Sequence, residues 1–203
     1  MEIKIPKRAE DLRIRHFKAF KEWNEEGMDT MDKARLVAAF TNRNIRYISS
    51  IDINDFDKIY NHILSVLSKI KINTKPPEEI QLNGRTYSLI DPHKTSAGWH
   101  MDWGELVKNG GFDKDPVKCA CLFYHPKGHG YGEVDRNSNL VHSIKDKYEI
   151  FNNEFPLSIF IESASFFLLK SIKSISISTE KKIWEIKATQ VTNQILSFCG
   201  RKS

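Results

Sequence analysis

Apolar residues recur at helical spacing through the first seventy residues, which predicts a mainly helical N-terminal part. Over residues 7–24 the side chains of Leu12, Ile14, Phe17, Phe20 and Trp23 fall roughly on one face, so a first helix is expected there. Gly27 is expected to end this helix. Three more helices are predicted over about residues 30–41, 43–49 and 55–71. Asp29 or Thr30 can cap the first of these, and Asn54 or Asp55 can cap the last.

A linker at residues 73–77 (NTKPP) marks the clearest boundary in the chain, because two prolines stop a helix. It divides the protein into an N-terminal helical part, 1–73, and a second part, 78–203, although a single domain also fits the length. Just after it, two alternating runs flank Asn83-Gly84. That dipeptide predicts a type I′ turn and a β-hairpin near residues 79–90.

The remainder is predicted to be helical, with two glycine-rich loops. Residues 91–113 are expected to form a loop with at most a short helical turn around residues 103–108. Asp115-Pro116 is typical of an N-cap followed by proline in the first turn. The fold class is therefore mainly α, with a small hairpin (α+β). The further helices are predicted over about residues 116–125, 138–152, 156–173 and 179–199.

Composition narrows the function classes only a little. The chain has 203 residues and a net charge of +5, which mildly favours an anionic partner. Six Lys and Arg residues in the first predicted helix fit either a phosphate-binding arm or a solvated face. Three cysteines, an odd number, argue against a disulfide framework. No signal peptide is expected, and the longest apolar run, 155–169, is too short to span a membrane and contains Glu162.

Unusual residues concentrate between positions 84 and 132, so candidate chemistry is sought there. This stretch holds eight of the ten glycines, four of the seven histidines and two of the three cysteines. A metal site would use Cys119, Cys121, His125 and His129, in the spacing C-x-C-x3-H-x3-H. On a helix, however, residues two apart point away from each other. We therefore expect neither a metal nor a cofactor.

An acid–base centre is the next candidate, because His100 and Asp102 lie close together in GWHMDW. They are two residues apart and share a face only on an extended strand, so a structural loop fixed by aromatic rings is favoured. Cys119 or Cys121 beside His100 is a further alternative. A DNA-binding helix-turn-helix over residues 30–51 is disfavoured, because the segment lacks the usual glycine in the turn and has few basic side chains to contact bases. The glycine loop of residues 128–132 lacks the Lys-Ser/Thr ending of a phosphate-binding loop.

A protein contact surface needs no special geometry and is the favoured interpretation. Aromatic residues and methionine on glycine-rich loops are enriched at interfaces. The candidate interaction residues are Trp99, His100, Met101, Asp102, Trp103, Tyr124, His125 and Tyr131.

The order of these features resembles small proteins of tailed bacteriophages, particularly those infecting Bacteroidetes. The resemblance runs over about residues 5–135 and rests on YSLIDPHKTSAGWHMDWGEL and DPVKCACLFYHPKG. Such proteins carry T-x-G-x-x-x-D-[LW] before a helix ending in Y-x-P. That pattern falls here on Thr95 to Trp103, with one additional residue before the glycine, and on Cys121 to Pro126. The chain departs from it at Ala97 and at His125, where a basic residue is usual, and the last 70 residues carry no resemblance.

The resemblance implies a non-enzymatic virion or tail-assembly protein of the neck, tail or baseplate, which works through protein–protein contacts. The expected partners are other phage structural proteins and further copies of the chain, in a virion assembled in the host cytoplasm. Nucleic acid is a less favoured partner, and no membrane partner is expected. The alternatives are an assembly chaperone absent from the mature particle, and a small enzyme or metal-binding protein using the region of His100, Asp102, Cys119 and Cys121.

Overall fold

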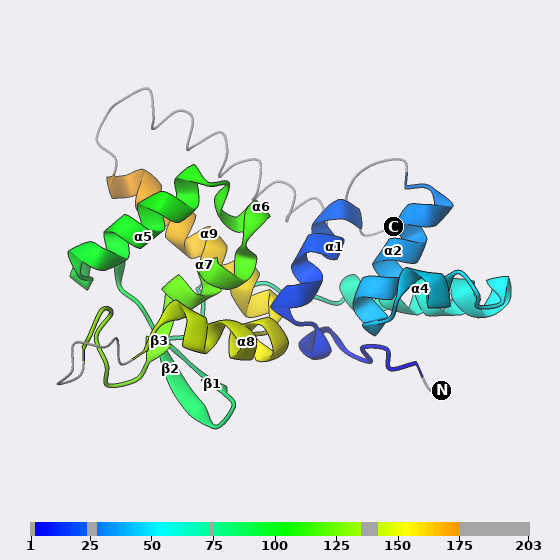
Figure 1. The fold of residues 1–203 in the computed structure, drawn as a ribbon, viewed down its shortest axis with the longest axis horizontal. Coiled ribbons are helices and arrows are strands. Elements are labelled where there is room, and N and C mark those ends of the chain that lie inside the picture. The colour runs from blue at the N-terminus through cyan, green and yellow to red at the C-terminus, as the bar shows by residue number, and fades with distance from the viewer. Residues whose placement is uncertain (1–2, 24–27, 74, 135–141, 175–203) are drawn as a thin grey trace.

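The computed structural model describes residues 3–23, 28–73, 75–134 and 142–174, and shows two neighbouring groups of elements (Figure 1). One group is helical: α1 (Phe17–Trp23), α2 (Thr30–Thr41), α3 (Ile45–Ile48) and α4 (Ile53–Leu67). The other combines a small sheet, β1 (Glu79–Leu82), β2 (Arg85–Leu89) and β3 (Tyr124–Pro126), with helices α5 (Ala97–Lys108), α6 (Gly111–Lys114), α7 (Pro116–Phe123), α8 (Ile144–Glu154) and α9 (Leu157–Ser174). The predicted fold class, mainly α with a small β part, is confirmed.

The single helix predicted over residues 7–24 is wrong. Two short 3₁₀ turns, Ala9–Asp11 and Ile14–His16, precede α1. Between them the backbone is extended and bonds to the segment before α9: Ile14 N–H donates to the Phe155 carbonyl at 2.9 Å, and Leu157 N–H donates to the Leu12 carbonyl at 3.1 Å. A distant strand-like pairing therefore replaces the local helix.

The next two long helices follow the predicted pattern. Asp29 caps α2 by accepting from the backbone N–H of Asp32, as one of the two expected caps. For α4 the cap is Asp52, two residues before the first predicted candidate, Asn54. α2 ends at Thr41, and its C-cap Asn42 has a φ of 53°, which turns the chain towards α3.

The hairpin is confirmed at the predicted dipeptide. Asn83 has φ 47° and Gly84 has φ 71°, the left-handed pair that a type I′ turn requires. The sequence pattern did not predict the third strand, β3, which pairs antiparallel with β2 at Leu89↔Tyr124. The predicted helix 116–125 consequently ends at Phe123, because its last two positions join the sheet before Pro126.

The loop predicted over residues 91–113 is wrong in its centre, where the twelve-residue helix α5 forms. Ser96 caps it, with its Oγ 3.4 Å from the Trp99 amide nitrogen. Trp99, Trp103 and Leu106 have helical spacing, and Trp99 and Leu106 are buried. Gly98 and Gly104 lower the helix propensity of the segment, so burial of this apolar stripe stabilises a helix that propensity disfavours.

The described residues form two hydrophobic cores, and each core includes residues from the other part of the chain. Ile14 belongs to the core built from residues 80–167, whereas Leu157 and Ile161 of α9 belong to the core built from residues 12–70. The buried Glu162 accepts hydrogen bonds from the backbone and side-chain nitrogens of Asn73, at 2.8 and 3.0 Å. The two groups of elements are thus interlocked on both sides of the predicted boundary. The predicted helix 179–199 and the helix end predicted at Gly27 lie outside the described residues.

Candidate functional site

An aromatic cluster anchors the region that the sequence singled out. Trp99 is 2% exposed, and its ring N–H donates to the Leu122 carbonyl at 2.9 Å. Trp103 stacks on Trp99 with ring centroids 5.8 Å apart and also contacts Phe123 and Phe167. The expected fixation of this segment by aromatic rings is therefore present, on the inner face of a helix instead of within a loop.

The structure divides the eight predicted interaction residues by exposure. Those that are buried belong to the core and offer no surface to a partner: Trp99, Tyr124 and His125. Tyr124 also donates its hydroxyl hydrogen to the Pro77 carbonyl at 2.7 Å, which ties the sheet to the linker. Asp102, Trp103 and Tyr131 are partly exposed, and His100 and Met101 are exposed.

The exposed part of this set is held together by two hydrogen bonds. Ser96, the cap of α5, donates through Oγ to the Tyr131 carbonyl at 3.2 Å. The Tyr131 hydroxyl donates to the Asp102 carboxylate on the next turn of the same helix. Burial and this carboxylate raise the pKa of Tyr131, so its hydroxyl stays protonated as a donor. These hydrogen bonds therefore hold the outer side of α5 and the loop of residues 127–134 together as one continuous surface.

The proposed histidine–aspartate pair is not formed. His100 Nε2 lies 3.2 Å from Thr95 Oγ1, while Asp102 accepts from Tyr131. The two side chains leave the helix in different directions, as their spacing of two residues requires.

The cysteine alternative also lacks its geometry. Cys119 and Cys121 of α7 are both fully buried. Burial raises the pKa of Cys121 to about 12 and raises that of Cys119 further. Since the thiolate is the nucleophilic form, both side chains behave as small core residues.

This burial predicts thiol reactivity. In a Cys199→Ser variant, which removes the cysteine outside the described residues, the native protein should react with no equivalent of an aromatic disulfide reagent at about pH 8. In denaturant the two remaining thiols should react at once. Rapid labelling of one native thiol would show that Cys119 or Cys121 is accessible and would restore the cysteine alternative.

Other predicted chemistry finds no support in the described part of the chain. No group of three or more His, Cys, Asp or Glu side chains there is arranged to hold a metal ion. The supposed recognition helix of a helix-turn-helix is α3, which has only four residues. Within the described ranges, no helix is long and apolar enough to cross a membrane.

Sequence reasoning missed a buried lysine. Lys147 of α8 is 2% exposed, and its Nζ donates to the carbonyls of Cys121 and Tyr124, at 2.6 and 3.2 Å. These carbonyls lie at the end of α7, where a positive charge is favourable. Burial lowers the Lys147 pKa to about 8. Lys147 lies three residues after Ile144 and four before Phe151, which places it on the apolar face of α8. This spacing could have indicated a buried lysine from the sequence.

His125 lies beside this lysine with its ring nitrogens unsatisfied. Both are buried and have no hydrogen-bond partner of normal geometry within the described ranges. Burial, then the charge of Lys147, lower its pKa to about 4; backbone groups of Pro126 and His129 act in the opposite direction and are outweighed. The ring is therefore neutral near pH 7. It packs between Tyr131 and His142, with ring centroids 5.8 and 6.2 Å away.

Comparison with known proteins finds no family model, no curated protein and no solved structure that matches this chain.

Proposed function

We propose that this chain is a bacteriophage virion or tail-assembly protein that acts through protein–protein contacts. The proposal rests on the resemblance carried by Thr95 to Trp103 and Cys121 to Pro126, and on the surface at the outer side of α5. We define the contact surface as His100, Met101, Tyr131 and Val134.

The observation that carries the proposal is the combination of exposed apolar side chains with a rigid support. Met101 is 74% exposed and Val134 is 53% exposed. The helix bearing Met101 is anchored by the buried Trp99, and the loop bearing Val134 is tied to it through Tyr131. A surface that is ordered before binding loses little conformational entropy when a partner arrives. Methionine and tyrosine are also enriched in protein interfaces.

The chemistry assembled in the same region favours contact over catalysis. The thiols are buried and protonated, and His100 and Asp102 have separate partners. The hydrogen bonds of Tyr131, Trp99 and Lys147 all fasten backbone or side chains within the fold. These features serve to hold a surface in one shape.

The test is genetic and uses particles of the phage that encodes the chain. A phage lacking the chain would be complemented with Met101→Glu or with Met31→Glu, and particles would be analysed by quantitative mass spectrometry. Met31 is the matched control because it is 50% exposed on α2, outside the contact surface. A charge buried at the interface should lower incorporation or particle yield by at least about tenfold for Met101→Glu only.

The same measurement separates the two forms of the proposal. A fixed copy number in the particle identifies a structural part of a symmetric assembly. Absence from the particle, together with failed assembly when the gene is removed, identifies an assembly chaperone. Normal particles without the chain would overturn the proposal, and equal effects of the two methionine variants would overturn the contact surface.

A further inference from the structure

A cavity of about 770 Å³ opens in the other part of the molecule, between the N-terminal segment and the end of α2. The residues that line it include Lys4, Lys7 and Arg15 from the segment before α1, and Arg43 after α2. The volume falls within the range of small-molecule sites. The cavity shares no residue with the contact surface, so a ligand bound there is independent of the proposed function.

The charge of the lining is strongly one-sided. Four cations, Lys4, Lys7, Arg15 and Arg43, face a single carboxylate, Asp11. Among the described residues, no carboxylate lies within ion-pair distance of the side-chain nitrogens of Lys4, Lys7 or Arg15. Such an excess of positive charge in a concave surface concentrates anions.

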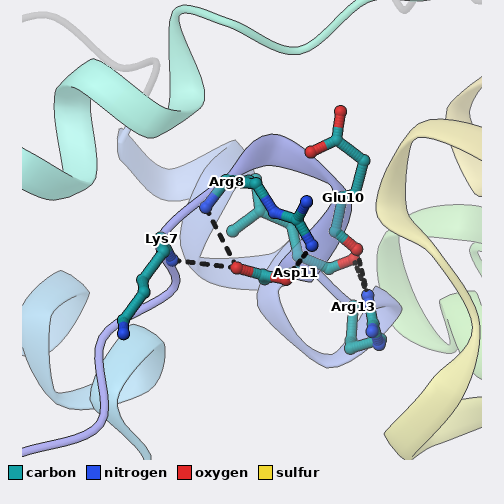
Figure 2. Close-up of polar contacts among 6 residues, drawn as sticks. Lys7, Arg8, Glu10, Asp11 and Arg13 are labelled. Atoms are coloured by element: carbon teal, nitrogen blue, oxygen red, sulfur yellow. Dashed lines mark hydrogen bonds and ion pairs between the residues drawn. The ribbon is translucent and has the colours of Figure 1, made fainter.

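Asp11 does not neutralise this excess, because its carboxylate is turned back onto the chain. Figure 2 shows Asp11 accepting from the backbone N–H groups of Lys7 and Arg8, both at 3.0 Å, while the Lys7 side chain extends away from it. The Arg8 guanidinium lies 3.9 Å from the same carboxylate. Burial works against ionisation of Asp11, but these N–H groups and Arg8 outweigh it and lower its pKa.

Two hydrogen-bond donors converge at the wall of the cavity. The backbone N–H of Arg13 donates to His16 Nδ1 at 2.9 Å, so the neutral ring must carry its hydrogen on Nε2. Arg15 Nε, which also carries a hydrogen, lies 3.4 Å from that Nε2. The Arg15 guanidinium also donates through Nη1 to Asn153 Oδ1 at 3.3 Å. In this tautomer the Nε2–H of His16, which is only 2% exposed, faces another donor and has no acceptor among the described residues, so the ring offers a donor to a ligand in the cavity.

We propose that this cavity binds a phosphate group, with Arg15 and His16 Nε2 as hydrogen-bond donors and Lys4, Lys7 and Arg43 as surrounding charges. Phosphate oxygens accept hydrogen bonds from such donors, and the phosphate group is anionic both in a nucleotide and in a nucleic-acid backbone. Its negative charge suits a lining in which Lys and Arg residues outnumber carboxylates. The same chemistry has two sources, a free nucleotide and the backbone of a nucleic acid, and the experiment distinguishes them.

The binding experiment uses the full chain with ATP in calorimetry and a fluorescent DNA duplex of about 20 base pairs in anisotropy, each at about 50 and 200 mM salt. The cavity variant is Lys7→Ala/Arg15→Ala. The matched control is Lys69→Ala/Lys71→Ala, which removes the same charge from exposed positions that do not line the cavity. Circular dichroism verifies that all three proteins are folded.

The cavity variant should weaken binding by about tenfold or more, and the control by less than about twofold. Saturable binding of one ATP per chain identifies a nucleotide, whereas binding of the duplex alone identifies nucleic acid. The proposal is overturned if neither probe binds, or if the two double variants weaken binding equally, because diffuse surface charge would then explain the affinity.

A second measurement needs no variant. In proton NMR spectra of the wild-type protein, inorganic phosphate should shift the ring signals of the buried His16 and leave those of the exposed His93 in place. In His16→Asn the amide oxygen can still accept from the Arg13 N–H, but the shorter side chain places no donor at the position of Nε2. This variant should bind the preferred probe about tenfold more weakly. Unshifted His16 signals at saturating phosphate would contradict the assignment of this ring as a ligand.

Discussion

Replacing Trp99 by alanine is expected to lower the free energy of unfolding by about 4 kcal/mol. Among the described residues its indole is the largest fully buried side chain; it stacks on Trp103 and contacts Phe167. Alanine would leave a cavity in a core that the surrounding helices cannot fully close. It would also leave the buried Leu122 carbonyl without the indole N–H that it now accepts from.

Two variants separate these contributions. Trp99→Phe keeps a ring and loses the hydrogen bond, so it should cost about 2 kcal/mol. Met101→Ala, two residues along the same helix, removes a 74% exposed side chain and should change stability by less than about 0.5 kcal/mol. Urea unfolding followed by far-UV circular dichroism measures all three. Equal losses at positions 99 and 101 would show that α5 is not anchored through Trp99.

Acidification from about pH 7 to about pH 5 is expected to remove about 4 kcal/mol of stability through two buried histidines. The pKa of His16 is lowered to about 4 by burial and by the charges of Arg15 and Arg13. That of His125 is also lowered to about 4, by burial and Lys147. Below about pH 6.5 the unfolded chain binds a proton at each position and the folded chain does not. This contribution to stability is therefore fully present above about pH 6.5 and is lost as the pH falls towards about 4, at about 2 kcal/mol per histidine by pH 5.

Two other ionisable residues, His142 and Glu162, also change how stability depends on pH. His142 also has a lowered pKa, first through burial and then through His129, and acts in the same sense. The raised pKa of the buried Glu162 acts oppositely, because the folded chain holds that proton more strongly. The histidine contribution is thus best measured as a difference between wild type and variants over the same pH range.

His125→Phe removes two unsatisfied ring nitrogens and should halve the loss, with little change of stability near pH 7. His16→Asn alone should also halve the loss, and the double variant His125→Phe/His16→Asn should remove nearly all of it. His93→Gln, at an exposed position, is the control and should leave the pH dependence unchanged. Chemical denaturation at about four pH values between 5 and 7 gives the slopes. A wild-type slope equal to that of the double histidine variant would contradict the burial of neutral rings.

Local patterns were sufficient where the interactions that form an element lie within a few residues. The cap of α2 at Asp29, the turn at Asn83-Gly84 and the proline start of α7 each satisfy their own backbone groups. The separation of His100 from Asp102 also followed from spacing alone, because it is a property of any helix. For these features the chemistry of neighbouring residues determines the conformation.

Contacts between distant segments decided the rest. The segment before α1 is not helical because residues 12–14 bond to residues 155–157, and α5 exists despite two glycines because Trp99 enters a core made by α7 and α9. The aromatic and glycine-rich stretch was singled out by its composition, but which of its residues face solvent depends on packing.

The sequence by itself determined a mainly helical chain with a type I′ hairpin and a basic, aromatic-rich composition. Only the tertiary structure decided that Trp99, Tyr124 and His125 are buried. It also decided that Lys147 binds a carbonyl at the C-terminal end of α7 and that basic residues near His16 line a cavity. The physical reason is range. Caps and turns gain their hydrogen bonds within a few residues. Burial, pKa shifts and the charge around the cavity arise instead where different elements meet, as when Lys147 of α8 binds the Cys121 carbonyl of α7, 26 residues away in the chain.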